Sequence, residues 1–265
     1  MPSIPGLEGT FDTAAAAYEK YRPGYPDALY RMILGYCPLD GTSQAAEIGI
    51  GTGQATLPFL QTGCSVLAVE RGAAMSAICR QKFAAYRSFS VVTDSFETAP
   101  LPQETFDLVY SATAFHWIPE QTGYPKVFSV LKHGGAFARF QNHPFPGREH
   151  PQLTAALDRL YAAYYDRFYG RQRTAPAEFT EQQAAERAAC AARYGFTDIR
   201  YALFHRTRTL SAADYCALLG TYSDHIAMPE PLRTEFFGEI GQAILAHGGT
   251  LTLHDTIDLQ LARKP

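Results

Sequence analysis

The chain has 265 residues, of which 46% are hydrophobic and 18% charged, a composition that suffices for a large core and excludes a disordered chain. With 23 Lys and Arg against 26 Asp and Glu, the formal net charge is −3, so the chain lacks the basic excess expected of a protein that binds nucleic acid or an anionic membrane. The five cysteines are widely spaced and form no CxxC motif, so neither a disulfide framework nor a metal site is expected.

Neither a secretory signal nor a membrane span is predicted. Residues 1–5, Met-Pro-Ser-Ile-Pro, contain no basic segment followed by an apolar run. The longest uncharged stretch, residues 48–69, has the length of a membrane span, but it contains four glycines and a proline. We therefore expect a cytoplasmic protein without a membrane partner.

Two helices are predicted first, at residues 11–22 and 26–36, and Pro23 ends the first of them. Short apolar runs then recur at a steady interval and predict buried strands at 44–48, 65–70, 89–94, 106–112 and 136–141. Helical stretches at 55–61, 73–86 and 124–131 separate the strands. This alternation is typical of a parallel sheet that is covered by helices on both faces.

The alternation breaks at residues 144–190, where helices are predicted at 153–169 and 181–194. The tail then supplies two further strands, at 198–210 and 251–262, which can form an antiparallel pair. We predict an α/β, Rossmann-like fold with a seven-stranded, mostly parallel sheet and one antiparallel strand. Residues 1–265 are expected to form a single domain, with N-terminal lid helices at 1–36 and an inserted helical cap at 144–190.

The strongest motif is Glu-Ile-Gly-Ile-Gly-Thr-Gly, from Glu47 to Gly53. It follows a predicted strand and opens a predicted helix, which is typical of a loop whose backbone approaches a nucleotide-like ligand. The dinucleotide pattern GxGxxG is not met, because Gln54 and Thr56 occupy the third glycine position in the two possible registers. Glu47 can pair with an ammonium group, which favours an amino-acid-bearing cofactor over NAD.

Further motifs follow in order along the chain. They are Val69-Glu70-Arg71, Asp94-Ser95-Phe96, Phe106-Asp107-Leu108-Val109 leading to Ala114-Phe115-His116-Trp117, and Leu131-Lys132-His133-Gly134-Gly135. Together with the glycine-rich motif they resemble the class I S-adenosylmethionine-dependent methyltransferases, and among these the small-molecule branch that includes trans-aconitate methyltransferase-like proteins. The resemblance covers residues 10–145, and it departs mildly at His133, where the family often has proline.

The resemblance implies S-adenosyl-L-methionine as the cofactor and methyl transfer to a small-molecule acceptor. It implies that Glu70 accepts the ribose hydroxyls, that Asp94 or the backbone after it meets the adenine, and that Arg22 lies near the methionine carboxylate. Each has a structural alternative: an acid at a helix N-terminus, a turn residue and a solvated arginine. The complete predicted cofactor set is Tyr21, Arg22, Glu47, Gly49, Gly51, Gly53, Glu70, Arg71, Asp94, Ser95, Phe96 and Ala112.

The resemblance implies that the loop after the fourth predicted strand borders the sulfonium and the acceptor, so His116 in this loop is the candidate catalytic residue. It could orient the acceptor or take its proton, and the alternative is a purely structural histidine. Methyl transfer is an in-line displacement that depends mainly on alignment, so it needs no catalytic triad or metal.

The acceptor is expected to be a small acid or another small polar molecule rather than a nucleic acid or a protein. Arg167, Arg171, Arg173 and Arg22 are candidate partners for a carboxylate, which needs no general base at neutral pH. Two alternatives remain open: an NAD-dependent oxidoreductase and a non-catalytic S-adenosylmethionine-binding protein. The oligomeric state is not predicted.

Overall fold

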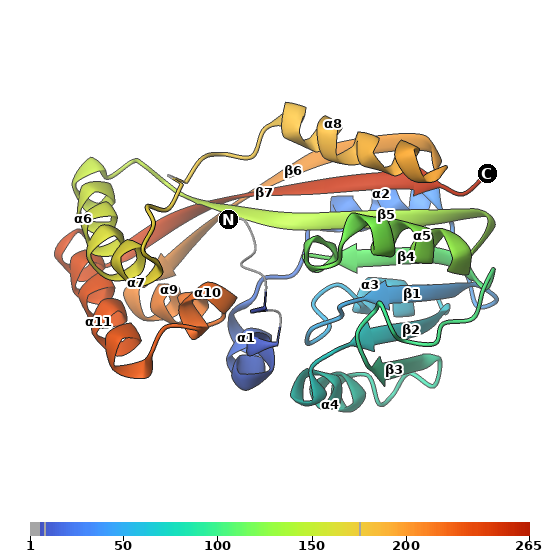
Figure 1. Cartoon of the computed structure of the whole chain (residues 1–265), viewed down its shortest axis with the longest axis horizontal. Coiled ribbons are helices and arrows are strands. Elements are labelled where there is room, and N and C mark those ends of the chain that lie inside the picture. Colours follow the sequence, from blue (N-terminus) through green and yellow to red (C-terminus); the bar gives the residue numbers. More distant parts are fainter. Residues whose placement is uncertain (1–5, 8, 175) are drawn as a thin grey trace. The chain divides into compact units, whose positions relative to one another are not determined.

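The computed structural model describes residues 6–7, 9–174 and 176–265 (Figure 1). The expectation that there is no secretory signal rests on residues 1–5, which lie outside the described residues. The chain divides into two compact units. Unit 1 comprises Met1–Arg22, Pro144–Glu178 and His205–Thr256, and unit 2 comprises Pro23–His143, Phe179–Phe204 and Ile257–Pro265.

The strands form one seven-stranded sheet in the order β3-β2-β1-β4-β5-β7-β6. Their bounds are β1 Gln44–Ile48, β2 Ser65–Glu70, β3 Phe89–Thr93, β4 Phe106–Ala112, β5 Leu131–Pro146, β6 Thr197–Ser211 and β7 Thr250–Arg263. The pairs β1–β2, β1–β4, β2–β3 and β4–β5 are parallel.

Strand β7 runs in the opposite direction. The N–H of Gly134 donates to the carbonyl of Lys264, and further along β5 the side chain of His143 contacts Asp258. Later residues of β5 therefore lie beside earlier residues of β7, so the two strands are antiparallel. Figure 1 shows the arrow of β7 pointing opposite to those of β1 and β4. The predicted mostly parallel, Rossmann-like sheet with an antiparallel strand is confirmed.

Helices α2 Asp27–Tyr36, α3 Leu57–Leu60, α4 Ala73–Lys82, α5 Glu120–Val130 and α8 Glu181–Ala189 accompany the sheet in unit 2. The helix predicted at 55–61 is wrong in length: α3 has four residues, and the chain between Gly51 and Thr56 forms turns instead. Gly51 and Gly53, which precede the predicted range, adopt positive φ angles that a helix does not allow, and the turns that begin there continue through Thr56.

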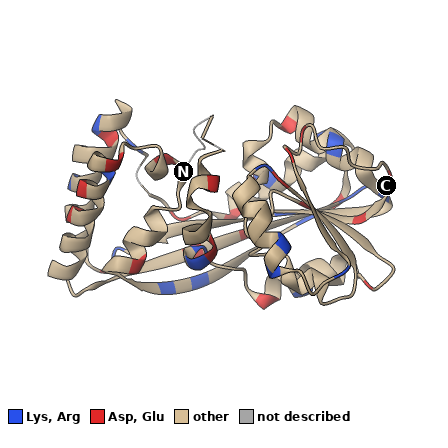
Figure 2. Ribbon diagram, turned by 90° about the horizontal axis from the view of Figure 1, so that it is seen from below, with Lys and Arg blue, Asp and Glu red and all other residues tan. Residues whose placement is uncertain are grey.

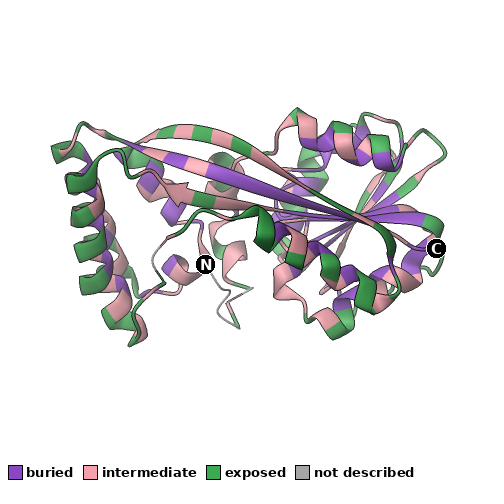
Figure 3. Cartoon of the chain, turned by 90° about the horizontal axis from the view of Figure 1, so that it is seen from above, coloured by how far each residue is buried: buried purple, intermediate pink, exposed green. Residues whose placement is uncertain are grey.

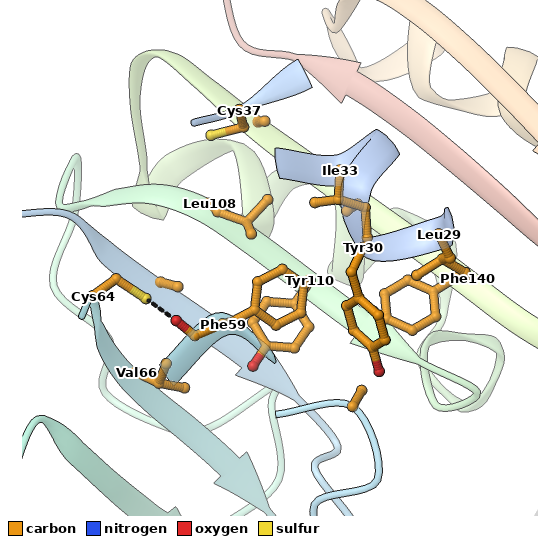
Figure 4. Close-up of a cluster of buried hydrophobic side chains, with 14 of the residues drawn as sticks. Leu29, Tyr30, Ile33, Cys37, Phe59, Cys64, Val66, Leu108, Tyr110 and Phe140 are labelled. Atoms are coloured by element: carbon orange, nitrogen blue, oxygen red, sulfur yellow. Dashed lines mark hydrogen bonds between the residues drawn. The ribbon is translucent and has the colours of Figure 1, made fainter. Parts of the chain in front are cut away.

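Unit 2 has two hydrophobic clusters, and alternate residues of β4 contribute to different ones. Leu108 and Tyr110 pack with Leu29 and Ile33 of α2 in one cluster, which Figure 4 shows, whereas Val109 packs in the other. Burial of each such side chain stabilises the fold by about 1.5–3 kcal/mol. Figure 3 shows the central strands largely buried, while no residue of β6 is fully buried.

Unit 1 is mainly helical around its own core. It contains η1 Thr10–Ala14, α1 Ala15–Tyr21, α6 Pro151–Tyr161, η3 Ala162–Asp166, α7 Arg167–Tyr169, α9 Ala212–Leu219, α10 Ser223–Ile226 and α11 Glu230–Ala246. The predicted cap at 144–190 is divided: residues 144–178 belong to unit 1, whereas α8 belongs to unit 2 together with η4 Cys190–Tyr194. Its role as a cap, like that of residues 1–36 as a lid, stays a prediction.

Charged residues of both signs are interspersed along the elements (Figure 2). Within the described residues, no helix is both long enough and apolar enough to cross a membrane. The same residues contain no group of three or more His, Cys, Asp or Glu side chains that could hold a metal ion.

Candidate functional site

The glycine-rich loop after β1 depends on backbone angles that favour glycine. Gly49, Gly51 and Gly53 have φ angles of +65°, +61° and +80°. A Cβ atom on Gly49 would also lie 2.5 Å from the Cβ of Ala114, in the segment that follows β4. The loop therefore requires glycine at Gly49 both for its conformation and for close packing.

Glu70, at the end of β2, fixes this loop from the neighbouring strand. Its Oε2 accepts a hydrogen bond of 2.8 Å from the N–H of Gly51, and its Oε1 accepts one of 2.8 Å from the N–H of Gly72. The side chain is only 9% exposed. Because Gly72 directly precedes α4, the carboxylate also lies at the start of a helix. This is the structural role of an acid at a helix N-terminus that the sequence offers as the alternative to ribose binding.

Glu47 is buried beneath the same loop. Its Oε2 accepts hydrogen bonds from Thr56 Oγ1 at 2.7 Å and from Tyr110 Oη at 2.8 Å. Its Oε1 is buried and has no hydrogen-bond partner in the part of the chain that the structure describes. Burial raises the pKa of Glu47 to about 7. An unpartnered buried carboxylate oxygen suits an ammonium donor, so the residues present fit the amino-acid-bearing cofactor that the sequence predicts.

Two further contacts near the glycine-rich loop could not be predicted from the sequence. Lys82 Nζ, from the last turn of α4, donates to the carbonyl of Thr52 at 3.0 Å and so gives the glycine-rich loop a second contact. Thr113, directly after β4, has a φ of +55°, and its hydroxyl lies 2.6 Å from that of Tyr25. A non-glycine residue in this region is strained and is held by its surroundings. Neither contact has a signature in local sequence.

The predicted adenine segment forms a tight turn after β3. Oδ1 of Asp94 accepts hydrogen bonds from the N–H of Ser95 at 2.7 Å and from Thr98 Oγ1 at 2.7 Å, which lower the pKa of Asp94. The side chain of Phe96 is buried in the core. Asp94 thus has the turn role that was its structural alternative, and contact with adenine stays a prediction.

The remaining predicted cofactor residues differ in their setting. Arg71 is exposed after Glu70, and Ala112 is the half-buried last residue of β4. Tyr21 and Arg22 belong to unit 1, so their role at the cofactor stays a prediction. Arg22 donates to the hydroxyl and the carbonyl of Thr221 at 2.9 and 2.7 Å.

The arginines proposed for the acceptor also lie in unit 1. Arg167 and Arg171 are exposed. Arg173 donates to Asp158 at 2.5 Å and lies over the ring of Tyr161. Arg173 therefore already has an acidic partner within its own unit, which weakens the interpretation of this set as carboxylate ligands.

His116 lies in the short helix η2 Phe115–Trp117, after β4. Burial, together with the positive charges of Arg139 and Arg187, lowers its pKa to about 3. Its Nδ1 is buried and has no hydrogen-bond partner among the described residues. His116 is therefore neutral at physiological pH and is a weak base.

Near His116, polar side chains line one face of β5 and β7. The bonds from Lys264 N–H to Gly135 O and from Gly147 N–H to Thr252 O share one register, which places Arg139 opposite Gln260 and Gln141 opposite Asp258. We call the side chains of this face, with the arginine that closes it, the polar strip; its members are Arg139, Gln141, His143, Asp258, Gln260 and Arg187.

Asp258 and Arg187 organise the polar strip. Asp258 is fully buried, and its Oδ1 lies 2.8 Å from His143 Nε2. Its Oδ2 accepts a hydrogen bond from Gln260 and lies 3.4 Å from Arg187 Nε. Arg187 Nη2 donates to Gln141 Oε1 at 2.9 Å. Burial opposes ionisation of Asp258, but the hydrogen bond from His143 and the charge of Arg187 outweigh it and lower the pKa of Asp258.

Arg139 is the exceptional member of the polar strip. Its guanidinium donates to Tyr124 Oη at 3.1 Å and lies 5.2 Å from the ring centroid of Phe115. It is 9% exposed, and it has no carboxylate partner in residues 6–7, 9–174 and 176–265. Since Asp258 already balances Arg187, the charge of Arg139 is uncompensated, and a buried charge without a partner is costly. The strip therefore offers a place for an anion.

Comparisons with known proteins agree with this geometry. Residues 46–138 match the methyltransferase domain family. A "methyltransferase-like" protein of Schizosaccharomyces pombe is 26% identical over 234 residues, which are 88% of this chain and 85% of that protein.

Solved structures share the fold. A protein of Anaeromyxobacter dehalogenans, assigned as a type II methyltransferase, has a TM-score of 0.62 at 21% identity over 92% of this chain and 98% of its own. Phosphoethanolamine N-methyltransferase 2 of Haemonchus contortus, solved with S-adenosyl-L-methionine, has a TM-score of 0.55 at 15% identity over 96% of this chain and 57% of its own.

Proposed function

We propose that this protein, an S-adenosylmethionine-dependent methyltransferase with the class I fold, methylates a small molecule at a carboxylate oxygen. The observation that carries the acceptor class is the uncompensated guanidinium of Arg139, buried on the strand next to β4. An acceptor carboxylate would supply the missing negative charge and could bind the planar guanidinium through two hydrogen bonds. The resemblance to trans-aconitate methyltransferase-like proteins agrees with an acid as acceptor.

The cofactor-binding part of the proposal assigns roles to the loop and its two carboxylates. Glu47 would pair with the ammonium group of S-adenosyl-L-methionine, and Glu70 would accept its ribose hydroxyls while holding Gly51 in place. When bound, the cofactor supplies a methyl group already activated by the adjacent sulfonium. The chain then needs to bind both reactants, align them and exclude water.

The neutral, weakly basic state of His116 supports an acceptor whose nucleophilic atom needs no deprotonation. A carboxylic acid with an ordinary pKa is ionised at neutral pH and is itself the nucleophile. A histidine with a pKa of about 3 is a poor general base for a phenol or an ammonium group. We therefore assign His116 the orientation of the acceptor rather than removal of its proton.

An acceptor panel tests this proposal. Purified protein is incubated with methyl-labelled S-adenosyl-L-methionine and with small mono-, di- and tricarboxylic acids, phenols and amines, and the products are identified by mass spectrometry. The proposal expects methyl esters of one or more acids. Turnover confined to phenols or amines would contradict the acid acceptor while leaving methyl transfer intact. Cofactor binding without turnover of any acceptor would favour the non-catalytic alternative.

A further inference from the structure

The polar strip contains a second group without a partner in the described part of the chain, the side-chain oxygen of Gln260, which needs a hydrogen-bond donor. Gln260 is 5% exposed, and its Oε1 has no hydrogen-bond partner among the residues that the structure describes. The orientation of the amide is fixed, because its Nε2 donates to Asp258; a flipped amide would turn its oxygen toward a carboxylate. Gln260 Oε1 is therefore a buried acceptor, and a ligand is the available source of its donor.

The register brings this acceptor next to the cation. Arg139 and Gln260 lie opposite each other on neighbouring strands, where Cβ atoms are about 4.5–5.5 Å apart. One small ligand can thus contact both side chains. The two requirements differ in kind, since Arg139 needs an anion and Gln260 needs a hydrogen-bond donor.

The charges of the polar strip favour a hydroxyl over an ammonium group as the donor to Gln260. An ammonium group bound to Gln260 would add a positive charge to a strip that already holds Arg139 and Arg187, and Asp258 is already engaged by Arg187, His143 and Gln260. A hydroxyl group donates without adding a third positive charge. Buried His116 Nδ1, also unpartnered among the described residues, is a further neutral group at this site.

We infer that the acceptor is a hydroxycarboxylic acid, whose carboxylate binds Arg139 and whose hydroxyl donates to Gln260. This inference rests on the proposed function and narrows its substrate class. Asp258 acts as a positioning residue, because it fixes both the amide of Gln260 and the guanidinium of Arg187. A site built to bind a hydroxyl discriminates against the analogue without it, since the buried acceptor then stays unpaired.

Matched acid pairs test the inference: malate with succinate, citrate with tricarballylate, and 3-hydroxybutyrate with butyrate. Affinity is measured by calorimetry in the presence of S-adenosylhomocysteine, and kcat/KM for ester formation is measured in parallel. In at least one pair the hydroxy acid should bind about tenfold or more tightly than its partner. In Gln260→Met the ratio should fall to near one with the affinity of the deoxy acid unchanged. Gln182→Met, on the exposed part of α8, is the control and should keep the ratio.

Each outcome decides. Equal affinities of hydroxy and deoxy acids in every pair, or a ratio that persists in Gln260→Met, would overturn the inference. If the variant fails to fold, the comparison on the wild-type protein is sufficient. Selective binding of hydroxy acids without ester formation would support a hydroxy-acid site at Arg139 and Gln260 and contradict the proposed function. Methylation of both members of each pair at equal kcat/KM would support the proposed function and overturn this inference. Acids that neither bind nor react would overturn the inference and the proposed function together.

Discussion

Glu70 Oε2 accepts a 2.8 Å hydrogen bond from the N–H of Gly51, across two neighbouring parallel strands. This bond joins the acid at the end of β2 to the middle of the glycine-rich loop after β1. The residue that the sequence assigns to ribose binding therefore also holds the loop. Loss of its carboxylate should affect the fold as well as cofactor affinity.

Glu70→Ala is thus expected to lower both quantities. Two backbone N–H groups, that of Gly51, which is buried, and that of Gly72, which is half-buried, would lose their acceptor, at a cost of about 2–3 kcal/mol in the free energy of unfolding. Affinity for S-adenosylhomocysteine should fall by roughly a hundredfold. Denaturant titration and calorimetry measure the two effects. A variant as stable as the wild type would show that Glu70 does not hold the loop.

Gly49→Ala should destabilise the protein by about 1–3 kcal/mol. The new methyl group would meet the Cβ of Ala114 at 2.5 Å, and alanine disfavours a φ of +65°. Gly35→Ala is the matched control: Gly35 lies within α2, and a Cβ there meets nothing within 4 Å. The control should be neutral or up to about 1 kcal/mol more stable, because alanine favours a helix. Equal effects of the two substitutions in thermal unfolding would contradict the predicted strain.

The raised pKa of Glu47 predicts two opposite pH dependences. Its folded pKa, about 7, exceeds the usual value of 4.5, so its stability contribution is complete below pH 4.5 and is lost as the pH rises through 7. The free energy of unfolding should decrease by up to about 1.4 kcal/mol per pH unit over this window.

Cofactor affinity should change in the other direction, because only the ionised carboxylate pairs with an ammonium group. Affinity for S-adenosylhomocysteine should rise between pH 6 and 8, and Glu47→Gln should abolish both this rise and the loss of stability. Calorimetry and denaturant titration at several pH values measure the two dependences. A wild-type affinity that is flat over this range would exclude Glu47 as the ammonium partner.

Much of the fold could be predicted from the sequence. Strands β1, β2 and β4 coincide with their predicted ranges, because each is a short apolar run bounded by turn residues. The full length of β5 could not be predicted, since the residues that extend it beyond the predicted range 136–141 include polar ones such as Asn142 and His143. A polar segment gives no apolar run, although His143 is paired with Asp258 on the neighbouring strand β7.

The candidate site divides in the same way. The loop and its two acids are contiguous motifs, so local sequence identifies them. The polar strip joins β5, β7 and α8, and its members become neighbours only through strand pairing. For this reason the sequence favoured Arg167, Arg171 and Arg173 as partners of the acceptor carboxylate. Arg139 needed the observation that a buried cation has no acidic partner.

The most direct test of the central claim, that Arg139 binds the acceptor carboxylate, measures activity and stability together in Arg139→Met. Ester formation from the preferred acid should fall about a hundredfold in kcat/KM, or about 2.7 kcal/mol, with affinity for S-adenosylhomocysteine unchanged. The free energy of unfolding should stay the same or rise, since an uncompensated buried charge is removed. Arg193→Met, at an arginine that is paired with Glu120 and largely exposed, should change neither. Full activity in Arg139→Met, or a fall in activity matched by a loss of stability, would contradict the account.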